Sequence, residues 1–396
     1  MTTQTVLIAG LSGRALAQSA RRAGFAPLVV DAFGDADMRD TAAASRCIPE
    51  AMRSGFRAGP LLAALDALAG TTASAPVGLV LGSGFEDTPK LVETLARRYR
   101  LLGNGGEQIA GAKDPVSFFS LLDKLAVAHP ETLLAPPAST TGWLSKRVGG
   151  SGGAHILACE QAKTRRGRYF QRRLEGDAVS VLVIARRDGA QVAGFSRQWC
   201  VGAEPRPCRY GGAVGPIRLD VPTEAAMIDA AQRVCRALGL IGLVSFDFLL
   251  SGGIPHLLEV NPRPGATLDV FDDAEGTLFR AHLTACAGHP GPLPATLGCR
   301  AAAILYAGRE AITPGAVAWP LWTADRPRPG TRTPPYRPIA TVLANDATAE
   351  GAERNCHRRL DELAEMLYAR TADREPKNAK IHRSRSERLG PGGQAR

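Results

Sequence analysis

The sequence predicts an α/β domain with a doubly wound parallel sheet at the N-terminus, followed by an α+β region of antiparallel strands. Three observations predict this combination. A strand-loop-helix-strand unit spans residues 5–31, strands separated by short turns fill residues 143–199, and two apolar runs flank a Gly-Gly turn within residues 243–260. The expected domains are 1–110, 111–200, 201–300 and 301–370, with a disordered basic tail at 371–396.

Length and composition restrict the class of protein. A chain of 396 residues with 45% hydrophobic residues suits two or three globular domains. No run of 18 apolar residues occurs, and the N-terminus lacks a basic segment before its first apolar run, so we expect neither a membrane helix nor a signal peptide but a cytoplasmic protein. The eight cysteines form no CxxC pair, which favours free thiols over a zinc site.

The net charge of +10 raises the question of nucleic-acid binding. Residues 371–396 contain seven Lys or Arg and three Asp or Glu, and a second basic cluster lies at 163–168. Neither is accompanied by an aromatic RNA-binding motif or a recognition-helix pattern. A solvated surface, or attraction to anionic small molecules such as nucleotides, is the better interpretation.

The first strand, at residues 5–9, ends in the loop GLSGR, which opens a helix that stops at Gly24. The loop lacks the GxGxxG pattern, so we expect it to hold part of a substrate rather than NAD. The strand at 77–81 ends in GSGFED, where Glu86 is a candidate substrate contact; the alternative is a loop that only caps the helix at 89–98.

The middle of the chain contains a lysine followed by a glycine-rich loop. A helix at 118–125 follows Lys113-Asp114-Pro115, and a strand at 143–147 contains Lys146. The next residues, VGGSGGAH, expose backbone N–H groups that suit phosphate oxygens, although they are not a Walker A motif; the alternative is a flexible hairpin loop.

The remaining elements follow from periodicity and turn residues. We expect a strand at 168–174, a hairpin around Asp188-Gly189, an irregular glycine-rich loop at 208–218, and a helix at 223–238 capped by Thr223 and stopped by Gly239. After the hairpin at 243–260 we expect a helix at 277–286, strands at 300–306 and 339–343, and a helix at 349–369.

The hairpin at 243–260 contains two acids on an apolar sheet. With a three-residue turn, Asp247 falls opposite Glu259, and Glu259 shares a face with Asn261; a bulge would shift this pairing by one. Two close carboxylates repel unless a cation lies between them, and oxygen ligands suit Mg²⁺. Arg263 would then meet phosphate or carboxylate oxygens. The alternative is a surface hairpin whose acids pair with nearby Lys or Arg.

The order of these features over residues 1–345 resembles the ATP-grasp superfamily, most specifically in Asp247 with Glu259-Val260-Asn261-Pro262-Arg263. The resemblance implies that ATP lies between two antiparallel sheets, one of them a mobile lid. It implies a metal set of Asp247, Glu259 and Asn261 that holds Mg²⁺, with Mn²⁺ as an alternative ion. It also implies that Arg263 steadies the acyl phosphate or the transferred phosphoryl group. The other implied ATP contacts are Lys113, Lys146, Gly149, Gly150, Ser151, Gly152, Gly153, Gln171, Arg172, Leu174 and Glu175. Of these, Lys113 departs from the family pattern, because it precedes its aspartate instead of following it.

The phrases EVNPRPGATLDVFD and GFED resemble the biotin-carboxylase-related branch, which includes tyramine–glutamate ligase of methanofuran synthesis. This resemblance implies a carboxylate–amine ligase of one-carbon cofactor biosynthesis, of the methanofuran or tetrahydromethanopterin type. Its partners would be a small acid and a small amine, with no nucleic acid or membrane, and it would form a homodimer. A biotin-carboxylase-like enzyme and a non-catalytic nucleotide-binding protein are the alternatives.

Overall fold

The computed structural model describes residues 3–162, 166–202, 206–295 and 297–372. The N-terminal sheet is parallel, in the order β3-β2-β1-β4, with β1 at Thr5–Gly10, β2 at Ala26–Asp31, β3 at Ala44–Cys47 and β4 at Leu79–Leu81. Both of its faces are buried, because Val6 and Ile8 of β1 contact one core while Leu7 and Ala9 contact another. Helices pack on these faces, as expected for a doubly wound domain; they are α1 at Arg14–Arg22, α2 at Ala36–Thr41, α3 at Ala51–Ser54, α4 at Ala58–Ala69 and α5 at Pro89–Arg98.

Two helices joined end to end connect this domain to a small sheet. Helix α6 (Gly106–Lys113) ends where α7 (Pro115–Lys124) begins, and the Asp114 side chain caps α7 by accepting the Ser117 N–H at 2.9 Å. The small sheet has the order β5-β8-β6-β7, with β5 at Thr132–Leu133, β6 at Trp143–Arg147, β7 at Leu157–Ala158 and β8 at Arg168–Arg172. We call it the lid sheet.

The largest sheet is antiparallel and has the order β13-β12-β9-β10-β11-β14-β16-β15. Its strands are β9 at Asp177–Arg186, β10 at Gly189–Cys200, β11 at Tyr210–Gly215, β12 at Gly242–Ser251, β13 at Ile254–Asn261, β14 at Cys299–Tyr306, β15 at Thr323–Ala324 and β16 at Pro338–Asp346. Helices α8 (Val221–Leu238), α10 (Thr277–Cys286) and α11 (Ala349–Ala372) pack against it, and α9 (Leu268–Phe271) lies near β11 and β14. The expected boundary after residue 200 thus coincides with the end of β10, and the one after residue 300 lies within β14, both in one continuous sheet.

Two expectations were wrong, one about a strand of this sheet and one about the cap of helix α8. Residues 208–218 are not an irregular loop, because Tyr210–Gly215 is an inner strand between β10 and β14. Its glycines serve close packing: a Cβ at Gly212 would lie 2.3 Å from the ring of Trp199. Helix α8 is capped by Asp220, which accepts the Thr223 N–H at 3.0 Å, so Thr223 is not the cap. Gly239 does end α8, in the left-handed conformation with φ of 62°.

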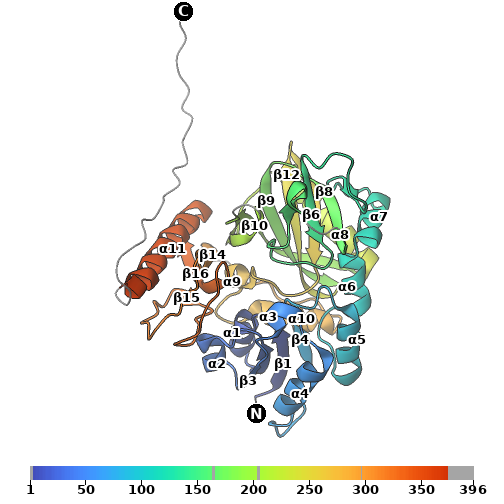
Figure 1. The fold of residues 1–396 in the computed structure, drawn as a ribbon. Helices are drawn as coiled ribbons and strands as arrows, with labels where there is room; N and C mark the ends of the chain where they lie inside the picture. The colour runs from blue at the N-terminus through green and yellow to red at the C-terminus, as the bar shows by residue number, and fades with distance from the viewer. Residues whose placement is uncertain (1–2, 163–165, 203–205, 296, 373–396) are drawn as a thin grey trace, which may run out of the picture.

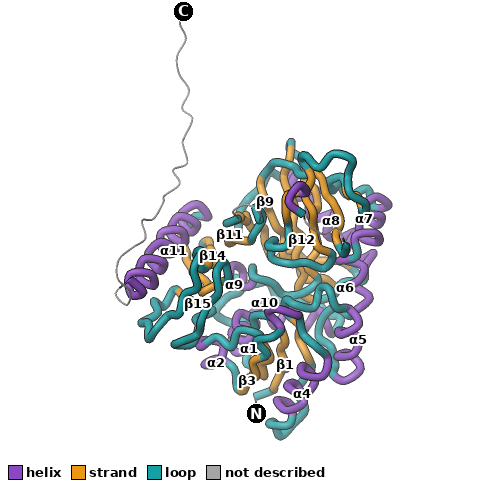
Figure 2. The backbone as a smooth tube through the Cα atoms, viewed as in Figure 1, coloured by secondary structure: helices purple, strands orange, loops and turns teal. Residues whose placement is uncertain are grey.

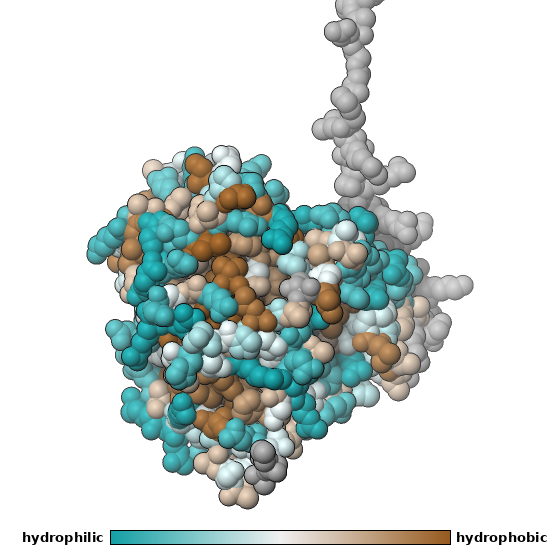
Figure 3. All heavy atoms as spheres, turned by 180° about the vertical axis from the view of Figure 1, so that it is seen from behind, coloured by the Kyte–Doolittle hydropathy of each residue, from teal (hydrophilic) through white to brown (hydrophobic). Residues whose placement is uncertain are grey.

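The outer surface is mostly polar, with apolar residues in separate patches on the face shown in Figure 3. Within the residues that the structure describes, no helix is both long and apolar enough to span a membrane. None of the eight cysteines, all of which lie within the described residues, forms a disulfide. Residues 373–396 of the expected tail lie outside the described residues. Residues 163–165 of the second basic cluster also lie outside them. Loops gather between the N-terminal sheet and the antiparallel sheet (Figure 2), and several candidate site residues lie on them.

Candidate active site

The β12–β13 hairpin places two carboxylates opposite each other. Its turn has two residues, Gly252 and Gly253, both at positive φ, instead of the expected three. A bulge between Asp247 and Phe248 offsets the shorter turn, so Asp247 still pairs with Glu259, and Ser245 pairs with Asn261. The predicted pairing of the two acids is confirmed, although the route to it differs.

Asn261 links the two acids. Its Nδ2 donates to Asp247 Oδ2 at 2.9 Å and to Glu259 Oε1 at 3.1 Å. Lys113 Nζ donates to Asn261 Oδ1 at 2.9 Å and lies 3.6 Å from Glu259 Oε2. Gln198 Nε2, from β10, donates to Asp247 Oδ1 at 3.1 Å. The acids therefore lie in a hydrogen-bonded cluster to which α6 contributes Lys113 and β10 contributes Gln198.

Burial and charge act on the two acids in opposite senses. Burial, with the neighbouring Glu259, raises the pKa of Asp247 above its usual range. Burial also raises the pKa of Glu259, but Lys113 and Lys146 outweigh it, and the net pKa lies below the usual range. One carboxylate is thus held ionised by two ammonium groups, while the other has no cation of its own.

This donor set fits a magnesium ion. Within the described residues no cluster of three His, Cys, Asp or Glu side chains exists, so a soft-metal site is not built here. Two carboxylates and an amide oxygen are instead hard donors of the kind that Mg²⁺ takes, with water and phosphate completing its shell. The Asn261 amide nitrogen donates hydrogen bonds to both carboxylates. A cation shared by the two acids would contact the same carboxylate oxygens.

The lid sheet contributes Lys146, which is 6% exposed. Its Nζ donates to Gln171 Oε1 at 2.5 Å, and Gln171 Nε2 donates in turn to Thr132 Oγ1 at 3.1 Å. Burial lowers the pKa of Lys146, against the attraction of Glu259. Lys113 and Lys146 both act electrostatically on Glu259, so the structure brings the two predicted lysines together at the acids.

The glycine-rich loop after β6 packs closely on two other segments. A Cβ at Gly149 would lie 2.6 Å from Asp87 Cβ, and a Cβ at Gly153 would lie 1.7 Å from the carbonyl oxygen of Cys208. Gly152 O accepts the Tyr210 N–H at 3.1 Å. The loop is therefore seated on the GFED loop and on the start of β11, which requires glycine at those positions.

Gln171 and Arg172, two of the implied ATP contacts, lie on opposite faces of the lid sheet. Gln171 lies on the face that carries Lys146, whereas the Arg172 side chain lies on the opposite face, with its guanidinium 5.5 Å from the ring centre of Trp143. Only the backbone of Arg172 remains available for the predicted role. Leu174 and Glu175 lie in the connection from β8 to β9, where Glu175 is exposed, and their nucleotide contacts stay a prediction.

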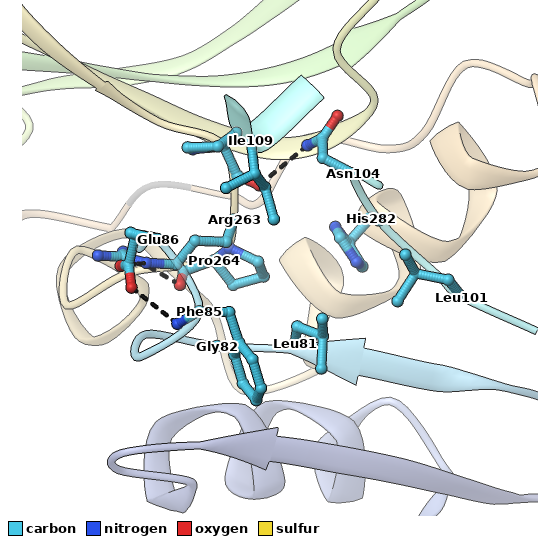
Figure 4. Close-up of a pocket in the computed structure, with 12 residues that line it drawn as sticks. Leu81, Gly82, Phe85, Glu86, Leu101, Asn104, Ile109, Arg263, Pro264 and His282 are labelled. Atoms are coloured by element: carbon cyan, nitrogen blue, oxygen red, sulfur yellow. Dashed lines mark hydrogen bonds and ion pairs between the residues drawn. The ribbon is translucent and has the colours of Figure 1, made fainter. Parts of the chain in front are cut away.

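Arg263, directly after β13, is held by the GFED loop. Its Nε donates to Glu86 Oε1 at 2.8 Å, while Glu86 Oε2 accepts the N–H groups of Gly84 at 2.6 Å and Phe85 at 3.0 Å. Figure 4 shows Arg263 and Glu86 in contact on one side of a small pocket, with His282 on the other side. Burial raises the pKa of Glu86, but Arg263 and Lys113 outweigh burial, and the net pKa lies below the usual range. Glu86 is therefore an anion that positions Arg263.

A cavity of about 320 Å³ joins these parts. Its lining includes Asp247, Glu259 and Asn261, together with Arg263 and, from the glycine-rich loop, Ser151 and Gly152. The far wall comes from the GLSGR loop and from the C-terminal strands, and includes Ser12, Arg14, Asp269, Asp325 and Thr341. The N-terminal loop therefore reaches the cavity, as its sequence suggested.

Three polar residues of this region had not been predicted. Gln198 follows an ordinary strand pattern, and His155 lies under the glycine-rich loop, where a Cβ at Gly150 would contact its ring. Burial lowers the pKa of His155 to about 4, so its imidazole is neutral at pH 7. Arg14 is buried, and only the presence of a charged residue in GLSGR could have drawn attention to it.

Known proteins resemble this chain at two levels. Residues 112–267 match the ATP-grasp domain family. The carbamoyl phosphate synthase large chain of Archaeoglobus fulgidus is 24% identical over 202 residues, which cover 45% of this chain and 18% of that one. The chain thus spans about a fifth of the length of that relative.

Two solved structures share the fold over nearly the whole chain. N5-carboxyaminoimidazole ribonucleotide synthetase of Thermotoga maritima has a TM-score of 0.65 at 16% identity, covering 91% of this chain and 98% of that one. The biotin carboxylase domain dimer of the Hydrogenobacter thermophilus 2-oxoglutarate carboxylase, in complex with MgADP, ADP and bicarbonate, has a TM-score of 0.67 at 12% identity, covering 90% and 89%. Residues 112–267 therefore form an ATP-grasp domain, and the fold of nearly the whole chain is shared with these two structures.

Proposed function

We propose that this protein is an ATP-dependent ligase that joins a carboxylate to an amine through an acyl phosphate and releases ADP and phosphate. One observation carries the proposal: Asp247, Glu259 and Asn261 converge with Lys113 and Lys146 from two other elements beside a glycine-rich loop. Such a set neutralises a polyphosphate and a metal ion in one place. A purely structural ion-pair network would not need Ser151 and Gly152 of the loop beside the same cavity.

The reaction has two steps, which the residues of the chain would support as follows. A carboxylate oxygen of the acid attacks the γ-phosphorus of ATP, the bond to the bridging oxygen breaks, and ADP leaves. Lys146 and the backbone N–H groups of Gly149–Gly153 would neutralise the transferring phosphoryl group, and Arg263, held by Glu86, would orient the acyl phosphate. The amine nitrogen then attacks the acyl carbon, phosphate leaves, and the ammonium product loses a proton to solvent. Mg²⁺ bound at the acids would supply positive charge to the phosphate oxygens.

The finer part of the proposal concerns the substrates. The resemblance of EVNPRPGATLDVFD to the tyramine–glutamate ligase branch favours an acid and an amine of one-carbon cofactor biosynthesis, of the methanofuran or tetrahydromethanopterin type. A homodimer belongs to the same proposal, and the dimer of the related biotin carboxylase domain supports it.

A carboxylase is the second candidate, because a fold relative was solved with bicarbonate. In that reaction bicarbonate would be the acid that receives the phosphoryl group. The two candidates differ only in the acid and its acceptor, so one assay separates them.

The test is ADP release by the purified protein with ATP, Mg²⁺ and a matrix of acids and amines. The panel would contain glutamate, aromatic ethylamines, pterin intermediates, bicarbonate and free biotin. The ligase proposal expects ADP release that needs one acid and one amine together. Turnover that needs bicarbonate and biotin would reject the ligase proposal in favour of a carboxylase. ATP binding without turnover on any pair would indicate a non-catalytic nucleotide-binding protein.

A further inference from the structure

The cavity at the metal set continues into a second chamber. This chamber, of about 110 Å³, shares Ser12, Ile304, Asp325 and Thr341 with the larger cavity. Its other walls are Phe33, Asp35 and the first residues of β16. It does not include the metal set or Arg263, so it lies at the end of the cavity away from the reacting groups.

Arg14 lines the larger cavity, contacts Asp325, which both spaces share, and is already neutralised. Its guanidinium, 2% exposed, pairs with Asp269 through contacts of 2.5 and 2.7 Å and with Asp325 through contacts of 3.0 and 2.8 Å. Two carboxylates on one guanidinium leave a net negative charge. Ser12 and Thr341 also donate to Asp325, so this carboxylate is fixed in place.

Asp35 adds a carboxyl group with an unpartnered oxygen. It is 5% exposed and lines the chamber, and among the described residues its Oδ2 has no hydrogen-bond partner. It precedes α2, but its side chain does not cap that helix. A buried, unpaired carboxyl oxygen is costly unless a ligand completes it.

The charges around Asp35 are mainly negative. Asp31, Asp37 and Asp325 all act on it, and Arg14 is the cation that opposes them. Asp37 is satisfied by the backbone N–H groups of Asp325 and Arg326, at 3.0 and 2.9 Å. Asp31 accepts the Gly34 N–H through Oδ1 at 3.0 Å, although its Oδ2 also lacks a partner among the described residues. Of these two acids, Asp35 is the one that lines the chamber.

We propose that the chamber between Asp35 and Asp325 binds a cationic nitrogen group, a primary ammonium or a guanidinium, of the substrate whose other end reaches the metal set. The link to catalysis rests on the proposed ligase function. Phe33 and Ile339 provide apolar wall for the carbon chain next to the cation. The substrate class is then an amine or acid with a second, non-reacting cationic group.

Protonation should respond to such a ligand. Burial, with Asp325 and Asp31, raises the pKa of Asp35 to about 9, so its carboxyl group is neutral at pH 7.5 in the absence of a cation. A cation beside it favours the ionised form. Binding should therefore release a proton from Asp35.

The experiment measures binding of butylamine and 2-phenylethylamine, against butan-1-ol and 2-phenylethanol, by titration calorimetry at pH 7.5 in two buffers of different ionisation enthalpy. We expect the amines to bind at least about tenfold more tightly than the alcohols, with proton release. In Asp35→Asn the amine affinity should fall about tenfold and the proton release should vanish. Asp40→Asn, an exposed acid on α2, is the matched control and should change neither.

Several outcomes would overturn the proposal. These are equal binding of amine and alcohol to the wild-type protein, unchanged amine affinity in Asp35→Asn, and Asp35-dependent displacement of the amines by Mg²⁺ or Mn²⁺. The wild-type comparison decides even if a variant does not fold. MgATP affinity is measured in parallel. If the protein binds the amines but not MgATP, the proposed ligase function is wrong, while the proposed cation binding in the chamber still holds.

Discussion

The charge of Glu259 is the single residue property on which the proposed metal site depends most. Glu259→Gln keeps the shape and a hydrogen-bond acceptor for Asn261 but removes the anion shared with Lys113 and Lys146. We expect kcat to fall at least about 100-fold, because charge stabilisation at the phosphates is lost. Amine-dependent ADP release measures this, with thermal unfolding to check folding and Glu310→Gln, an exposed acid, as the control. Near-normal kcat at saturating Mg²⁺ would show that Glu259 holds no metal.

His282 should give the fold a pH dependence. It is buried, accepts the Leu243 N–H at Nδ1 at 2.9 Å and contacts Leu102 O through Nε2 at 3.0 Å. Burial lowers the pKa of His282 from 6.5 to about 4, so between these values the unfolded chain takes up a proton that the folded protein refuses. The free energy of unfolding should thus fall on acidification through this window, by at most about 1.4 kcal/mol per pH unit, and His282 should contribute no pH dependence above it.

The measurement is urea unfolding at several pH values between 4 and 7, which bracket the window for His282. His282→Gln should reduce the slope of stability against pH, whatever it does to stability at pH 7. His289→Gln, an exposed histidine just beyond α10, should leave the slope nearly unchanged. Equal slopes for wild type and His282→Gln would contradict the prediction.

At the scale of elements, the glycine-rich loop offers a matched pair of substitutions. Gly152 and Gly153 both have positive φ, of 69° and 71°, but only a Cβ at Gly153 meets the backbone of Cys208; at Gly152 the space is open. Both alanines cost backbone strain, and only Gly153→Ala should push the loop away from β11. We expect the kcat/KM for ATP to fall roughly 10- to 100-fold in Gly153→Ala and much less in Gly152→Ala. Similar losses in both would mean that seating on β11 does not matter.

At the scale of the whole molecule, we expect the basic tail to be dispensable. Residues 373–396, which lie outside the described residues, are polar and basic and offer little apolar surface to bury. A chain ending at Ala372 should keep its kcat, its KM for ATP and its melting temperature. A large loss of activity in this truncation would assign the tail a role in substrate binding or assembly.

Much of the architecture could be predicted from local patterns. The helix at Pro89–Arg98, the strand at Trp143–Arg147 and the helix at Thr277–Cys286 lie at or next to their expected bounds. Local periodicity, caps and turns set these elements, and they are written in adjacent residues. The glycine-rich strand β11 was wrongly expected to be a loop. Its glycines make room for the ring of Trp199 on the neighbouring strand and do not form a turn.

The sequence alone determined the chemistry of the hairpin: two carboxylates and an amide on facing strands, with an arginine next in the chain. Only the tertiary structure decided which distant groups complete it. Arg263 is held by Glu86, 177 residues away, and Arg14 by Asp269 and Asp325, 255 and 311 residues away. The reason is physical: the pairing of strand neighbours follows from backbone periodicity, whereas contacts between domains depend on how buried faces pack, which no local pattern records.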